Sequence, residues 1–327
     1  MAAALSNGNV HAGQTPIEAF TQHAQYSEAR ISPNGKYLAM TVDEQGRNLL
    51  VVLNLSDMAI VHTVRLADEK SVAEFAWAGP ERLVFDAARN VGSYAQPFLT
   101  GEWYAVNADG SQGRTLLAYN VAGGSIGQTK QISYTDGYSL LHPLPEDPGQ
   151  ILMTVSSAAS TQVVSVDTMS GQRRVLAKIA KGGCSFALDV SHQPNMAVCS
   201  DDRGENGTYE INSQLYRVDG GGRWNLMSDS RTSGERIVVL DSAPDGRVYA
   251  IADDRKLPAA FGLLDGSTGQ FKKLFQDPVS DPARFIVGSD GHTILAVVTA
   301  AGVPHIEMVD ANSPDTKLYA SLANSFP

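Results

Sequence analysis

The residues that first suggest chemistry form a glycine-rich pentapeptide. Residues 123–127 read Gly-Gly-Ser-Ile-Gly, which matches the G-x-S-x-G pattern of a serine nucleophile elbow. Such an elbow needs a buried strand before the serine and a helix after it, so that the hydroxyl projects from a strained turn. The residues that follow are polar and β-prone, with no helical period. We therefore interpret Ser125 as part of a flexible loop and expect no catalytic residue in this chain.

The histidines are further candidates for chemistry, because imidazole binds metals and transfers protons. None has a partner at i+4, and no His-Glu-x-x-His or Cys-x-x-Cys motif is present. The acidic segment 201–207 lacks the alternating spacing of a calcium loop. These patterns predict no metal ligand and no cofactor. The seven histidines are His11, His23, His62, His142, His192, His292 and His305.

The two cysteines, Cys184 and Cys199, lie on two expected antiparallel strands joined by a short hairpin. If the turn centres near residues 193–194, Cys199 faces Ala187 and not Cys184. This register favours two buried thiols, with a disulfide as the alternative. Two cysteines do not define a compartment.

One short sequence pattern recurs six times, and the fold that it specifies must position all of these residues. In each copy a strand ends in an acidic or amide residue, a turn follows, and a second strand closes on paired apolar residues, the last pair being Leu318 and Tyr319. The six anchors are separated by 53, 60, 52, 46 and 45 residues, which is the length of a propeller blade. The anchors are Asn54, Asn107, Asp167, Asp219, Asp265 and Asp310.

A second hairpin precedes each copy, most clearly at the Pro33-Asn34-Gly35 turn. Two hairpins per period make four antiparallel strands. Only residues 16–25 predict a short helix, because no later stretch keeps a 3.6-residue apolar period for three turns. The sequence therefore predicts an all-β fold, a β-propeller with six four-stranded antiparallel blades. A flexible leader is expected at residues 1–14 and the propeller at 15–327, with blades over about 26–66, 72–118, 131–179, 184–228, 235–276 and 283–321.

Stacked blades bury both faces of each sheet, so large apolar residues are expected between them. We interpret these residues as core, not as cofactor contacts; they include Phe75, Trp77, Phe85, Phe186 and Phe285. Carboxylates that begin inner strands could instead bind a metal in the propeller tunnel, which is the alternative for Glu28, Glu74 and Glu235.

Three segments carry a resemblance to a known family. Residues 26–39 (Tyr-Ser-Glu-Ala-Arg-Ile-Ser-Pro-Asn-Gly-Lys-Tyr-Leu-Ala), residues 75–77 with 82–85, and residues 100–110 resemble the N-terminal propeller of bacterial prolyl oligopeptidase (S9) family serine peptidases, near the acylaminoacyl-peptidase and dipeptidyl-peptidase branch. The resemblance covers most of the chain from about residue 15. It implies a seven-bladed propeller followed by an α/β-hydrolase domain that carries the catalytic triad. This sequence shows six blades and no hydrolase domain, so the family activity is not carried over.

The charge balance argues against two classes of partner. The formal net charge is -10 and the pI about 5.1, whereas nucleic-acid binding relies on clustered Lys and Arg. No window approaches the roughly 18 apolar residues of a membrane span. We expect neither a nucleic-acid partner nor a membrane-spanning segment.

The longest loops, at 89–100, 119–130 and 201–213, indicate a binding face. Within them Arg89 and Tyr94 are the candidate binding residues, since Arg pairs with carboxylates and Tyr offers a large amphipathic surface.

We thus expect a non-catalytic propeller module that resembles the substrate-gating domain of an S9 peptidase. Its partners would be an α/β-hydrolase domain, fused or separate, and peptides. The resemblance favours a periplasmic or secreted location. The alternatives are a free-standing propeller that binds a protein or peptide through its loops, and a metal-dependent propeller enzyme.

Overall fold

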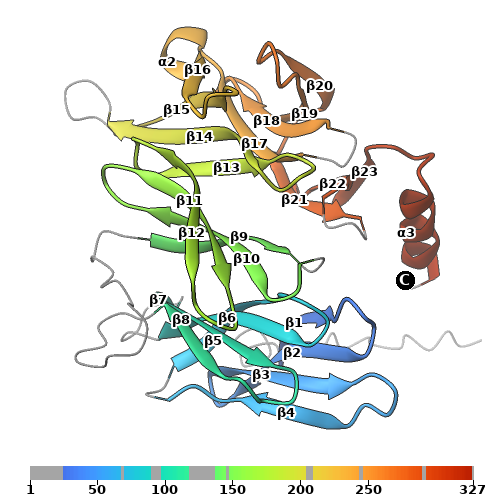
Figure 1. Cartoon of the computed structure of the whole chain (residues 1–327). Helices are drawn as coiled ribbons and strands as arrows, with labels where there is room; N and C mark the ends of the chain where they lie inside the picture. The colour runs from blue at the N-terminus through green and yellow to red at the C-terminus, as the bar shows by residue number, and fades with distance from the viewer. Residues whose placement is uncertain are drawn as a thin grey trace, which may run out of the picture. The chain divides into compact units, whose positions relative to one another are not determined.

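The structure is a computed structural model that describes residues 25–67, 70–89, 97–117, 137–144, 147–203, 209–242, 246–288 and 292–325. It contains two compact units, residues 1–113 and 114–327. The described chain is all-β and forms six antiparallel sheets whose strands follow one another in sequence, so the predicted β-propeller fold is confirmed (Figure 1). None of its described helices is long and apolar enough to cross a membrane.

The first unit holds the sheet with strand order β1-β2-β3-β4 and the strands β5, β6 and β7 of the sheet with order β5-β6-β7-β8. Leu50 and Phe75 are fully buried in its core, and Trp77 and Phe85 are nearly so. The Nε1 of Trp77 donates a hydrogen bond of 3.0 Å to the carbonyl of Arg30, which ties the second sheet to the first. The strands are β1 (Tyr26–Ile31), β2 (Tyr37–Glu44), β3 (Arg47–Asn54), β4 (Ile60–Val64), β5 (Lys70–Trp77), β6 (Arg82–Arg89), β7 (Phe98–Asn107) and, at the start of the second unit, β8 (Arg114–Leu117).

The second unit holds the remaining four sheets, three with four strands and one with three. Its strands are β9 (Gly137–Leu144), β10 (Gln150–Ser156), β11 (Thr161–Asp167), β12 (Arg173–Ile179), β13 (Cys184–Leu188), β14 (Pro194–Arg203), β15 (Tyr209–Val218), β16 (Trp224–Asp229), β17 (Arg236–Ser242), β18 (Val248–Asp253), β19 (Ala260–Leu264), β20 (Phe271–Phe275), β21 (Pro282–Val287), β22 (Ile294–Thr299) and β23 (His305–Met308). The helices are α2 (Ser230–Ser233) and α3 (Pro314–Ser325).

Three apolar clusters join consecutive sheets of this unit. Phe186 lies in the first, edge-on to Trp224, whose Nε1 donates to the carbonyl of Lys178 on the preceding sheet. Phe285 packs on the third beside Phe261. The aromatic residues expected between blades therefore lie in the core, as the sequence predicts.

The anchor residues Asp167 and Asp265 hold the turn between the third and fourth strands of their sheets. Oδ1 of Asp167 accepts backbone N–H groups from Met169 and Ser170, and Oδ1 of Asp265 does the same for the two residues of its own turn. The bonds in the second of these turns lower the pKa of the Asp265 carboxyl. A side chain that caps its own turn is the physical reason for the acidic or amide residue at this position of the repeat.

The last sheet differs from the expectation at its final strand. Leu318 and Tyr319, expected in a strand, lie in helix α3. Ser313 starts this helix by accepting the backbone N–H of Thr316 through Oγ, and Pro314 takes the first helical position, which lacks an N–H requirement. The Ser-Pro-Asp helix start outweighs the apolar pair that marks strands in the other repeats, so β21-β22-β23 has three strands.

The prediction of free thiols is wrong, because Cys184 and Cys199 form a disulfide. Cys184 pairs directly with Cys199 across β13 and β14, and Ala187 pairs with Met196. The turn lies earlier than expected, since Asp189 accepts the N–H groups of Ser191 and Gln193 and closes a tight loop. A bulge between Ala187 and Leu188 completes the shift in register.

Candidate metal centre

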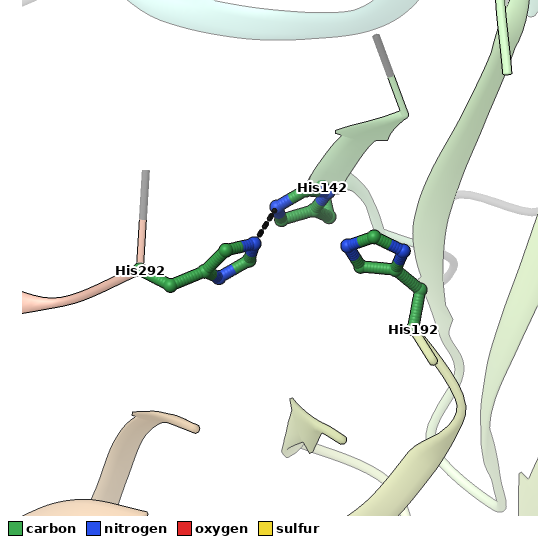
Figure 2. A group of neighbouring side chains, drawn as sticks. All are labelled: His142, His192 and His292. Atoms are coloured by element: carbon green, nitrogen blue, oxygen red, sulfur yellow. Dashed lines mark hydrogen bonds between the residues drawn. The ribbon is translucent and has the colours of Figure 1, made fainter. Parts of the chain in front are cut away.

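Three histidines from three different sheets meet in the second unit. Figure 2 shows the rings of His142, His192 and His292 turned toward one another, and one ring nitrogen from each lies within 4.8 Å of the other two. The Nε2 atoms of His142 and His292 are 3.0 Å apart. Two nitrogens bound to one tetrahedral zinc ion lie about 3.3 Å apart, given Zn–N bonds of about 2.0 Å. Small side-chain rotations would therefore bring all three nitrogens onto one ion.

A bulge aims His142 at this point. In the ladder between β9 and β10, His142 pairs with Leu152 and Leu140 with Met153, so Leu141 is the extra residue. A bulge re-aims the side chains beside it and is frequent next to functional sites. The ring of His142 contacts both of the other rings, at centroid distances of 4.8 Å to His192 and 4.5 Å to His292.

His192 lies in the turn between β13 and β14. Its backbone has a φ of 55°, the left-handed region that residues other than glycine seldom adopt. The turn is fixed by Asp189, whose carboxylate accepts two N–H groups and whose carbonyl accepts the N–H of His192 at 2.9 Å. Such strained positions persist where the surroundings enforce them, and they gather at functional sites.

His292 lies in the turn between β21 and β22, and its other ring nitrogen meets a carboxylate. Nδ1 of His292 is 2.9 Å from Oδ2 of Asp241, which is near the end of β17 in the neighbouring sheet. A second bulge, between Val239 and Asp241, lies beside this carboxylate. Both side chains are largely buried, with 15% of His292 and 29% of Asp241 exposed.

The carboxylate determines where the protons lie. Ionised Asp241 can only accept, so Nδ1 of His292 carries the proton and Nε2 presents its lone pair to the cluster. While the ring of His292 is neutral, the Nε2 of His142 is therefore the donor in the 3.0 Å contact. For an ion to bind both Nε2 atoms, the proton on Nε2 of His142 would have to move to Nδ1 of the same ring; the lone pairs of His142 and His292 would then be directed at the ion, while Asp241 holds the second ring in place. A ligating histidine whose other nitrogen donates to a carboxylate is the usual arrangement in protein metal sites.

All four residues lie at corresponding places in their sheets, either near the end of the first strand or in the turn that joins it to the second. His142, His192, Asp241 and His292 are accordingly separated by 50, 49 and 51 residues. Local motif searches miss this set because no two members are close in sequence. The signal that would have found it is recurrence at the blade-length period.

The residues singled out from the sequence lie elsewhere or outside the described residues. Arg89 is exposed at the end of β6 in the first unit. Glu28 accepts from Nε of Arg30 at 2.7 Å, which pairs its charge, and Glu235 is not among the residues that meet in the cluster. Tyr94, Ser125 and the expected helix at 16–25 fall outside the described ranges.

Glu74 of the first unit has an unusual environment. Burial raises the pKa of its carboxyl, and the nearby charge of Asp86 raises it further. Asp86, itself buried, accepts the backbone N–H of Glu74 at 2.7 Å, and burial raises its pKa as well. Among the described residues these two carboxylates form no ligand group of three, so we interpret them as inner-strand polarity.

Known proteins resemble this chain in structure alone. No family model and no curated protein sequence matches it. Puromycin hydrolase matches with a TM-score of 0.52 and 15% identity, over 89% of this chain and 46% of that chain. Dipeptidyl peptidase 4 from Porphyromonas gingivalis matches with a TM-score of 0.51 and 9% identity, over 92% and 47% of the two chains. Acylaminoacyl peptidase from Pyrococcus horikoshii gives 0.52 and 12%, over 91% and 46%.

These three proteins are S9 family peptidases, and the chain spans about half the length of each. At such identities the likeness shows the propeller fold. It agrees with the sequence resemblance to the propeller domain of that family.

Proposed function

We propose that the second unit of this propeller binds one divalent transition-metal ion of the zinc class through His142, His192 and His292. The observation that carries the proposal is the convergence of three imidazoles from three sheets, with a carboxylate from a fourth sheet on the outer nitrogen of one of them. Imidazole nitrogens suit zinc, copper, nickel and cobalt, whereas magnesium and calcium take oxygen ligands.

A bound ion would also affect the stability of the fold. Each ligand belongs to a different sheet, so a bound ion cross-links three sheets and, through Asp241, reaches the fourth. A ligand that binds only the folded state stabilises it by mass action. The metal would therefore bind and stiffen the whole second unit.

Metal binding is tested by titrating purified, metal-free protein with Zn²⁺ in a calorimeter and counting the bound ion by elemental analysis. We expect one ion per chain, and a loss of binding in His142→Ala, His192→Ala and His292→Ala. His305→Ala is the matched control, because His305 lies on β23 outside the cluster and is exposed. Equal binding by the triple variant and the parent chain would contradict the proposal.

The likeness to S9 peptidase propellers favours a second candidate function. In it the chain controls the access of peptides to an α/β-hydrolase partner, fused or separate, and has no turnover of its own. The likeness over about nine tenths of this chain supports this role. The Cys184–Cys199 disulfide supports a location in an oxidising compartment, such as the periplasm or the exterior.

Peptide access is tested with fluorescently labelled unstructured peptides and a labelled folded protein of low mass. We expect peptides to raise the anisotropy on binding and the folded protein to leave it unchanged. Arg89→Ala should weaken the response, and Arg174→Ala, which removes another exposed arginine, should not. Absence of binding by every peptide would argue against this role.

A further inference from the structure

We infer that the ion held by His142, His192 and His292 keeps one coordination position open, and that this position takes a small carboxylate ligand. This inference rests on the proposed metal binding and names the chemistry that the site would recognise.

The donor count leaves room for a further ligand. Among the described residues three nitrogens form the ligand group, and zinc in proteins is usually bound by four donors. The Oδ2 of Asp241 lies 2.9 Å from Nδ1 of His292, which is not the ring nitrogen that makes the 3.0 Å contact with His142. Asp241 therefore orients a ligand and does not bind the ion. Three protein nitrogens with one remaining position is the pattern of zinc sites that exchange water or substrate.

The charge of the site favours an anion. Three neutral imidazoles leave the double positive charge of the ion uncompensated, and Asp241 returns one negative charge from beyond the ring of His292. Neutral nitrogen ligands on a doubly charged ion favour an anionic donor at the remaining position. A carboxylate supplies both the charge and an oxygen atom that zinc accepts.

The position of the site makes such a ligand reachable. His142, His192 and His292 are all partly exposed, and two of the four residues lie in turns between strands. Each of these residues is positioned by a sheet or by one of its turns, through the bulges and the Asp189 turn described above. Side chains fixed on separate rigid elements can hold an ion without closing around it.

The experiment uses Co²⁺ in place of zinc, because the visible spectrum of cobalt reports its ligands. We expect the chain of 327 residues to bind one Co²⁺ ion, and acetate to shift the visible bands in a saturable way with one acetate per ion. Acetamide, the neutral analogue of the same shape, should leave the bands unchanged. Azide serves as a second anionic probe and should also shift them.

Peptides identify the source of the carboxylate. A short peptide with a free C-terminus should reproduce the acetate shift if peptide termini are the ligands, and its C-terminally amidated form should not. A response to acetate with none to the free peptide would assign the position to small free carboxylates. An equal response to the amidated peptide would overturn the carboxylate assignment.

The failure of this inference is distinguishable from the failure of metal binding. If Co²⁺ binds but neither acetate nor azide changes its spectrum, the protein supplies the full set of ligands. The inferred open position is then wrong, while the proposed metal binding stands. If Co²⁺ does not bind, the proposed function fails. His305→Ala should behave as the parent chain in every titration.

Discussion

Nδ1 of His292 lies 2.9 Å from Oδ2 of Asp241, and the two residues belong to neighbouring sheets. The contact fixes both the orientation and the tautomer of the imidazole, and it does so before any ion arrives. Asp241 is therefore a positioning residue for the candidate metal centre.

The Asp241→Asn substitution should weaken zinc binding. An amide can still approach Nδ1, but it neither stabilises the polarised imidazole nor enforces its tautomer. Loss of such an outer carboxylate typically lowers metal affinity roughly 10- to 100-fold. Competition with a chromogenic zinc chelator gives the affinity of each variant.

Asp147→Asn is the matched control for this substitution, since it removes an exposed carboxylate that follows His142 in the same unit. Its zinc affinity should stay near that of the parent chain. Equal losses in the two variants would show that Asp241 acts only through its charge.

Reduction of the Cys184–Cys199 disulfide should lower the stability of the second unit. The bridge closes a loop with a sequence separation of 15, for which chain-entropy reasoning gives about 3 kcal/mol. Thermal unfolding with and without a reductant should show a lower midpoint for the reduced chain. The double variant Cys184→Ser with Cys199→Ser should unfold at a low midpoint that no longer responds to reductant; a midpoint equal to that of the oxidised parent would refute the stabilising role.

The turn anchors Asp219 and Asp265 should make stability depend on acid pH. Hydrogen bonds from turn N–H groups and side chains lower the pKa of each from 3.8 to about 2. Because the folded pKa lies below the unfolded value, the stabilisation is present above about pH 4 and is lost as the pH falls toward 2. NMR titration of the two carboxyl groups should give midpoints near 2.

Denaturant midpoints measured between pH 4 and pH 2 check the consequence for stability. The Asp219→Asn and Asp265→Asn variants should lose less of their stability over this interval than the parent chain. Asp265 is exposed to solvent and Asp219 is partly exposed, so salt should also reduce the pH dependence. Identical pH profiles for parent and variants would exclude the turn bonds as its source.

Substitution of Gly262 by alanine should destabilise the sheet formed by β17 to β20. A Cβ at this position would lie 2.7 Å from the ring of Phe271 and closer still to the carbonyl of Lys272, so the strands β19 and β20 would have to separate. Overpacking of this kind typically costs about 1–3 kcal/mol. Gly266→Ala is the control, because no atom lies within 4 Å of its Cβ position. Chemical unfolding of both variants should show a loss for Gly262→Ala alone.

The fold was predictable from the sequence because its determinants are local and repeated. The anchors Asp167 and Asp265 cap their own turns, and alternating apolar residues such as Val163 need only the neighbouring sheet to be buried. Each repeat carries this information within about fifty residues, so the blades and the aromatic residues of their core could be predicted from the sequence. The sequence pattern did not predict the helix that begins at Pro314, because a short helix-start signal competes there with a strand pattern of similar strength.

The candidate metal centre depended on tertiary structure. His142, His192, Asp241 and His292 meet only after four sheets pack in order, and two bulges and one left-handed backbone position turn their side chains to a common point. The pairing of Cys184 with Cys199 likewise depended on where a five-residue turn closes. The sequence by itself determined a propeller of repeated antiparallel sheets, because turn and burial preferences act over short distances. Only the tertiary structure decided which distant side chains share a site, because register and sheet packing set those distances and no local pattern encodes them.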